Sequence, residues 1–101
     1  MNAYLTQRVR DKHGIDWNEE YLLGLVNHLN TVKVMNILAV AFEVMTHATT
    51  HKYLSQLIEK GYLMHTVGDD KRVKVVTLTK KGEKLIKELA DVSSLPSLVL
   101  R

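Results

Sequence analysis

The sequence contains no cysteine, one proline, one tryptophan and one phenylalanine among its 101 residues. Without cysteine, neither a disulfide scaffold nor a thiolate metal site can form. No stretch approaches the roughly 18 apolar residues that a membrane-spanning helix requires. The first residues, MNAYLTQRVRDKHG, alternate polar and charged side chains and lack the apolar core of a signal peptide. These absences predict a cytoplasmic protein.

The composition is that of a folded chain, with 46% hydrophobic and 25% charged residues. A chain of 101 residues buries enough surface for one core, so we expect a single domain over residues 1–101. Within it, residues 1–15 would form an N-terminal arm or short helix. Residues 92–101 would form an aliphatic C-terminal tail.

The excess positive charge lies in the second half of the chain. Residues 60–84 hold seven Lys/Arg against three Asp/Glu, whereas residues 1–59 hold five against six. A local basic patch is typical of a protein that binds a polyanion. A solvated face that keeps a small protein soluble gives the same pattern, so charge alone leaves both interpretations open.

Hydrophobic periodicity and capping residues predict a helix over residues 17–30. Asp16 and Glu19 stand three residues apart, the spacing of a capping box at a helix start. Trp17, alone at this helix start, is expected in the core. The apolar positions of the helix are Tyr21, Leu22, Leu25, Val26 and Leu29.

A helix-turn-helix is expected next. Asn36 would cap a helix over residues 36–45, although this apolar run alone does not exclude a buried strand. Thr46 would cap a second helix over residues 47–60, which Gly61 would end, with Lys60 favourably placed in the last turn. The short turn between the two helices is that of a helix-turn-helix.

A β-hairpin follows the second helix. The segments YLMHTV and VKVVTL read as strands, and GDDKR between them reads as a turn. Thr79 would cap a last helix over residues 80–91, in which Gly82 is a weak point costing about 1 kcal/mol relative to alanine. The β-branched residues 31–34 could pair with the hairpin. The expected fold is α+β and mainly helical: a winged helix-turn-helix with a small antiparallel β-sheet.

Two motifs stand in order within this arrangement. The pattern L-x-x-L-x-x-K-G occupies residues 54–61, and D-x-R, five residues and L-T-x-x-G occupy residues 70–82. The residues that carry them are Leu54, Leu57, Lys60 and Gly61, then Asp70, Arg72, Leu78, Thr79 and Gly82. Over about residues 20–90 the chain resembles the DNA-binding core of the MarR-type winged helix-turn-helix regulators.

This resemblance implies a homodimeric transcriptional regulator that binds double-stranded DNA. The recognition helix 47–60 would enter the major groove and the wing 68–74 would lie at the minor groove. A glutamine there can pair with adenine and a lysine with guanine or phosphate, while a wing arginine senses a narrow minor groove. The expected DNA-binding residues are Thr49, His51, Lys52, Ser55, Gln56, Lys71, Arg72 and Lys74, with Asp70 holding Arg72 by a salt bridge.

The alternative is a winged helix that binds protein, as an adaptor or inhibitor of transcription or replication machinery. The recognition helix carries little charge, and the apolar side chains of residues 37–45 cannot all face one core. Part of that surface, or the tail 95–100, could meet a protein partner.

Histidines offer the remaining chemistry. His47 and His51 stand at i, i+4, with His65 as a possible third ligand, but no H-E-x-x-H pattern accompanies them, and we expect no metal site. They could make DNA binding sensitive to mild acid. No catalytic constellation or phosphate-cradling glycine loop is present, so we expect neither an enzyme nor a cofactor.

Overall fold

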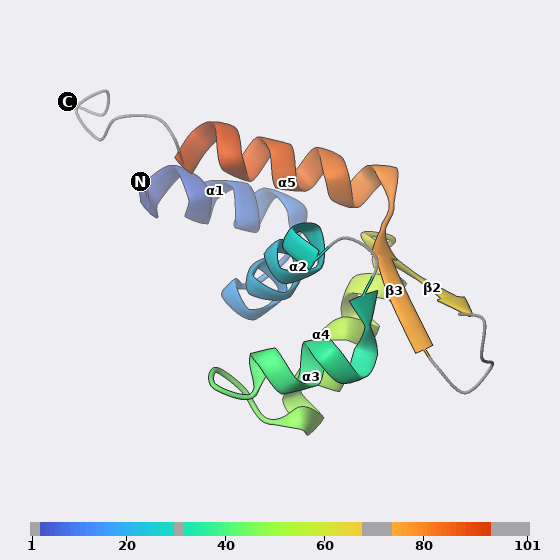
Figure 1. Ribbon diagram of the computed structural model, residues 1–101. Helices are drawn as coiled ribbons and strands as arrows, with labels where there is room; N and C mark the ends of the chain where they lie inside the picture. The colour runs from blue at the N-terminus through green and yellow to red at the C-terminus, as the bar shows by residue number, and fades with distance from the viewer. Residues whose placement is uncertain (1–2, 30–31, 68–73, 94–101) are drawn as a thin grey trace.

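The computed structural model describes residues 3–29, 32–67 and 74–93 (Figure 1). The wing-tip residues Asp70, Lys71 and Arg72 lie outside the described residues, as does the tail 95–100. None of the described helices is long and apolar enough to cross a membrane. The elements are α1 (Ala3–His13), α2 (Trp17–Leu29), β1 (Val32–Lys33), α3 (Val34–Ala41), α4 (His47–Glu59), β2 (Leu63–Val67), β3 (Lys74–Leu78) and α5 (Lys80–Ser93).

The three strands form one antiparallel sheet in the order β1-β3-β2. The hairpin register pairs Leu63 with Leu78 and Val67 with Lys74, and β1 joins it through Val32 opposite Val76. The hairpin extends away from the helices, while α3 and α4 lie on one side of the molecule and α1 and α5 on the other (Figure 1). The predicted winged helix-turn-helix fold is confirmed.

Helix α2 lies at the centre of the core, between the α1–α5 pair and the helix-turn-helix (Figure 1). Its residues Leu22, Leu23 and Val26 are fully buried. They belong to one apolar cluster with side chains from every other helix and from the sheet, because each of those elements turns one apolar stripe inward. The largest buried partners are Ile37, Leu57, Leu63, Val76 and Leu85.

The predicted caps at Asp16, Thr46 and Thr79 are confirmed. Asp16 and Glu19 exchange the two hydrogen bonds of a capping box, at 2.9 and 3.2 Å. Thr46 accepts a hydrogen bond from the Thr49 backbone N–H at 3.2 Å, and Thr79 accepts one from the Gly82 N–H at 3.1 Å. These bonds fix where α2, α4 and α5 begin.

Helix α3 differs from the prediction at both ends. It begins at Val34, directly after β1, because extended Lys33 serves as its N-cap, and Asn36 therefore lies inside the first turn. It ends at Ala41, whose carbonyl accepts hydrogen bonds from the N–H groups of both Val44 and Met45. This turn carries Met45 into the core, where it is 8% exposed.

Trp17 and Gly82 also correct the prediction. Trp17 was expected in the core, but it is 54% exposed, because it opens α2 on the side that no other described element covers. Gly82 is buried, and a Cβ atom there would lie 2.2 Å from the carbonyl oxygen of Tyr62. Glycine is therefore needed for this close approach and is not a weak point of α5.

Candidate nucleic-acid interface

Helix α4 buries one face and exposes the other. Thr50, Leu54 and Leu57, spaced by four and three residues, are buried against the core. The opposite face carries the side chains expected to meet DNA. His51, Lys52 and Ser55 are exposed there, and Thr49 and Gln56 are half-buried.

The first turn of α4 is held by local contacts. The Thr49 hydroxyl accepts a hydrogen bond from the Thr46 hydroxyl at 3.0 Å, in addition to the backbone cap. The His47 ring lies edge-on to Phe42 with centroids 5.1 Å apart, which ties α4 to the turn after α3. Lys52 holds its ammonium 5.5 Å from the Tyr53 ring centroid. The N-terminal half of the helix is thus fixed without using the side chains of His51, Ser55 or Gln56.

The wing is described up to its tip. Lys74 opens β3 opposite Val67 and is exposed. The predicted roles of Asp70, Lys71 and Arg72 stay predictions, because these residues lie outside the described part of the chain.

A hollow of about 110 Å³ lies between α4 and the hairpin. His51 and Ser55 reach it from α4, His65 from β2 and Lys74 from β3. Its apolar wall is formed by Val34, Leu54, Ile58 and Val76. From the sequence, His65 was considered only as a third metal ligand. Strand register places His65 opposite Val76 on the same face, and strand alternation alone does not specify that register.

An ion pair anchors the end of α4 to α2. The Lys60 ammonium donates hydrogen bonds to both carboxylate oxygens of Glu19, at 2.9 and 2.7 Å, and to the Gly14 carbonyl at 2.7 Å. Beside it, burial raises the pKa of Tyr62, while the nearby Lys60 charge lowers it in part. In the sequence, Lys60 stands near the helix C-terminus and in the L-x-x-L-x-x-K-G motif, and neither feature indicates Glu19 as its partner.

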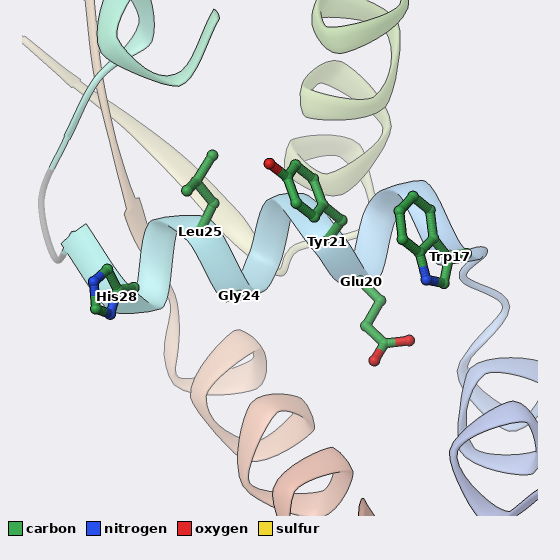
Figure 2. Close-up of a pocket in the computed structure, with 6 residues that line it drawn as sticks. All are labelled: Trp17, Glu20, Tyr21, Gly24, Leu25 and His28. Carbon is green, nitrogen blue, oxygen red and sulfur yellow. The ribbon is translucent and has the colours of Figure 1, made fainter. Parts of the chain in front are cut away.

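A second, more open hollow of about 390 Å³ lies on α2 (Figure 2). The rings of Trp17 and Tyr21 stack with centroids 5.7 Å apart and planes 17° from parallel. In Figure 2 these rings and Leu25 stand on one side of the helix, and Glu20 points away from them. The hollow is lined by Trp17, Glu20, Tyr21, Gly24, Leu25 and His28.

Apolar side chains are also exposed on α3 and the turn after it. Val40 is 46% exposed, Phe42 64% and Val44 43%, whereas Ile37 is fully buried. The expectation that residues 37–45 cannot all face one core is confirmed. Among the described residues, no three His, Asp or Glu side chains are grouped in a way that could hold a metal ion.

Comparison with known proteins places these features in context. No protein-family model matches the chain. The HTH-type transcriptional regulator Hpr of Bacillus cytotoxicus is 31% identical over 80 residues, which cover 78% of this chain and 42% of the relative. Hpr of Bacillus mycoides matches over the same shares at the same identity. The chain therefore spans less than half the length of the curated relatives it matches.

Solved structures show the same arrangement of elements. The S. aureus MepR–DNA complex has a TM-score of 0.77 at 20% identity, covering 85% of this chain and 70% of that one. A mutant MarR from E. coli complexed with operator DNA has a TM-score of 0.78 at 16% identity, covering 90% and 64%. Likeness at such identities establishes the fold. The resemblance inferred from the two motifs is confirmed: this chain has the winged helix-turn-helix fold of the MarR-type regulators.

Proposed function

We propose that this chain binds double-stranded DNA as a transcriptional regulator, with α4 in the major groove and the wing 68–74 at the minor groove. The observation that carries the proposal is the exposed face of α4. Its side chains are small or hydrogen-bonding, as entry into a groove requires, and the opposite face is anchored in the core. The similar structures of MepR and MarR were solved with DNA bound.

The charge pattern of α4 supports the same proposal. Residues 47–58 contain no acidic residue, and the first acid of the helix is Glu59, in its last turn. The N-terminus of a helix carries partial positive charge, which favours a nearby phosphate. The end of α4 proposed to enter the groove is therefore free of like-charge repulsion with DNA.

The proposed contacts divide by chemistry. Gln56 would reach a base edge, Lys52 would reach a guanine edge or a phosphate, and Thr49 and Ser55 would position the helix on phosphates. In the wing, Arg72 would enter the minor groove, braced by Asp70, with Lys71 and Lys74 on phosphates. His51 would lie at the edge of the helix nearest the hairpin.

We further propose a homodimer that acts in the cytoplasm as a single domain without catalytic activity. Two copies would double the number of phosphate contacts, which matters because each copy offers few basic groups. The curated relatives are described as transcriptional regulators, a class that acts by binding.

Protein binding is the rival function, and one observation favours it. Val40 on α3 and Phe42 and Val44 in the turn after it expose apolar surface. The exposed polar face of α4 and the DNA-bound structures of similar fold support DNA binding more directly.

Fluorescence anisotropy with a labelled random-sequence duplex tests the proposal. Wild type should bind, and its affinity should fall steeply between about 50 and 200 mM salt. Lys52→Ala should weaken binding severalfold and reduce the slope of log affinity against log salt by about 0.9. Lys87→Ala, which removes the same charge from exposed α5, is the matched control and should bind nearly as wild type. Absent or salt-independent binding, or equal loss in both variants, would refute the proposal.

A further inference from the structure

The hollow between α4 and the hairpin has two chemically distinct parts. Its rim carries the side chains of His51, Ser55, His65 and Lys74, all of them exposed, above an apolar wall. Its volume of about 110 Å³ is well above the roughly 10–15 Å³ that a cavity needs to hold one water molecule. The hollow is thus open to solvent at a polar rim and has room for a small polar group.

Regular geometry brings the four rim residues together. His51 and Ser55 stand at i, i+4 on α4 and point to the same side of that helix. On the sheet, His65 is paired with Val76, and Lys74 lies two residues before Val76, so His65 and Lys74 are diagonal neighbours on one face. The buried contact of Val76 with the core holds this face against α4.

The side chains on the rim carry hydrogen-bond donors that no described residue engages. Within the part of the chain that the structure describes, no hydrogen bond or ion pair engages the side chains of His51, Ser55, His65 or Lys74. No described residue that lines the hollow is acidic. A lysine, a hydroxyl and two imidazoles around one space form a set of donors that suits an anion with several oxygen atoms.

The position of the hollow indicates which anion it would bind. If α4 occupies the major groove and the hairpin lies at the adjacent minor groove, the DNA strand that separates these grooves must pass between the two elements. We propose that the hollow seats a phosphate of that strand, held by His51, His65 and Lys74 with Ser55 as an additional donor. This inference rests on the proposed function and adds His65 to the DNA-contacting residues.

A phosphate held in this hollow would make DNA binding depend on pH. An ordinary histidine takes up a proton near pH 6.5, and a phosphate beside it favours the protonated form. Binding would therefore be coupled to proton uptake at His51 and His65, and affinity would rise as the pH falls. The surrounding elements also carry Lys33, Lys52 and Glu59, none of which lines the hollow.

Duplex binding measured at constant ionic strength from about pH 8 to 5.5 tests the seat. Wild-type affinity should rise at least severalfold on acidification, and the double variant His51→Gln, His65→Gln should bind more weakly than wild type and lose most of that rise. The matched control is His28→Gln, which removes an exposed histidine from α2 and should keep the full rise.

The outcomes separate the two proposals. If wild type and the double variant bind duplex with the same pH dependence, the proposed phosphate site is wrong and the proposed DNA binding still stands. If the His28→Gln control loses the pH response equally, the proposed phosphate site is also wrong, because a general effect of histidine charge would then explain the pH dependence. Wild type that binds no duplex would overturn both.

A second measurement identifies the source of the phosphate. The His65 ring-proton resonance, titrated against pH by NMR, should move its midpoint to higher pH when duplex is added. Inorganic phosphate at the same total phosphate concentration should move it much less, because only DNA is held in place by α4 and the wing. An equal shift with inorganic phosphate would overturn the assignment to the DNA backbone and leave a site for free phosphate.

Discussion

The ammonium of Lys60 lies 2.7 Å from a carboxylate oxygen of Glu19, and the Glu19 side chain is only 3% exposed. The pair joins the end of α4 to the first turn of α2, the helix at the centre of the core. Because Glu19 also completes the capping box of α2, one carboxylate fixes both a helix start and the seating of the proposed recognition helix.

Lys60→Met should destabilise the protein by about 2 to 3 kcal/mol, because it leaves a buried carboxylate without its partner. Adding Glu19→Gln to this variant should recover part of the loss, since the amide carries no charge and can keep the capping bond. Urea unfolding followed by circular dichroism measures both changes.

Lys12→Met is the control for this prediction. Lys12 pairs with Glu88 at 3.1 Å, but its side chain is 67% exposed, so the loss should stay below about 1 kcal/mol. Similar destabilisation by Lys60→Met and Lys12→Met would contradict the anchoring role of the Lys60–Glu19 pair.

Gly82→Ala should destabilise the protein by about 2 kcal/mol or more, although alanine is the better helix former. The added methyl group would lie 2.2 Å from the Tyr62 carbonyl oxygen, which accepts a hydrogen bond from the Thr79 N–H at 3.1 Å. The start of α5 or of β2 would have to move. Thermal unfolding measures the effect.

Gly24→Ala provides the comparison within the same protein. Outside the adjacent residues and backbone of α2, no atom lies within 4 Å of a Cβ placed at Gly24, so this variant should be stabilised by up to about 1 kcal/mol. If both alanine variants were stabilised, the close approach of Gly82 to Tyr62 would be wrong.

Glu88 should titrate below its ordinary range. Hydrogen bonds from His13 first, and then from Lys12, lower the pKa of its carboxyl from 4.5. A lowered pKa in the folded state stabilises the protein above the unfolded-state value, and that stabilisation is lost as the pH falls through the folded-state value. The free energy of unfolding of wild type should therefore exceed that of Glu88→Gln down to about pH 4.5, and the difference should shrink below that pH.

The carboxyl titration of Glu88, followed by NMR, measures this shift directly. His13→Gln replaces the largest cause, so the Glu88 pKa should move back toward 4.5 in that variant. The stability effect itself should be small, because the Glu88 side chain is 34% exposed. A Glu88 pKa at or above 4.5 in wild type would show that the α1–α5 contact does not form in solution.

The features predictable from the sequence were local ones. The caps at Asp16, Thr46 and Thr79 follow from bonds between residues three apart, and the apolar stripe of α4 follows from helical spacing. The winged-helix order followed from these elements. The same locality explains why His51, Lys52 and Ser55 lie on the exposed face of α4.

The features that escaped prediction depend on distant residues. Lys60 meets Glu19 across 41 positions, and Gly82 meets Tyr62 across the junction of β2 and α5. Trp17 was misplaced because its burial depends on which neighbours cover α2, and periodicity does not specify them. His65 lines the hollow because the strand register places it opposite Val76. That register is known only once both strands of the hairpin are aligned.

The central claim is that α4 and the wing together form a surface that binds DNA. Amide NMR spectra of labelled protein titrated with duplex DNA test it most directly, because they report on each residue separately. The resonances of residues 47–56, His65 and 68–74 should shift, while those of α1 and α5 should shift little. Shifts confined to the apolar surface of Val40, Phe42 and Val44, or to the α2 hollow, would contradict it, as would no shift at all.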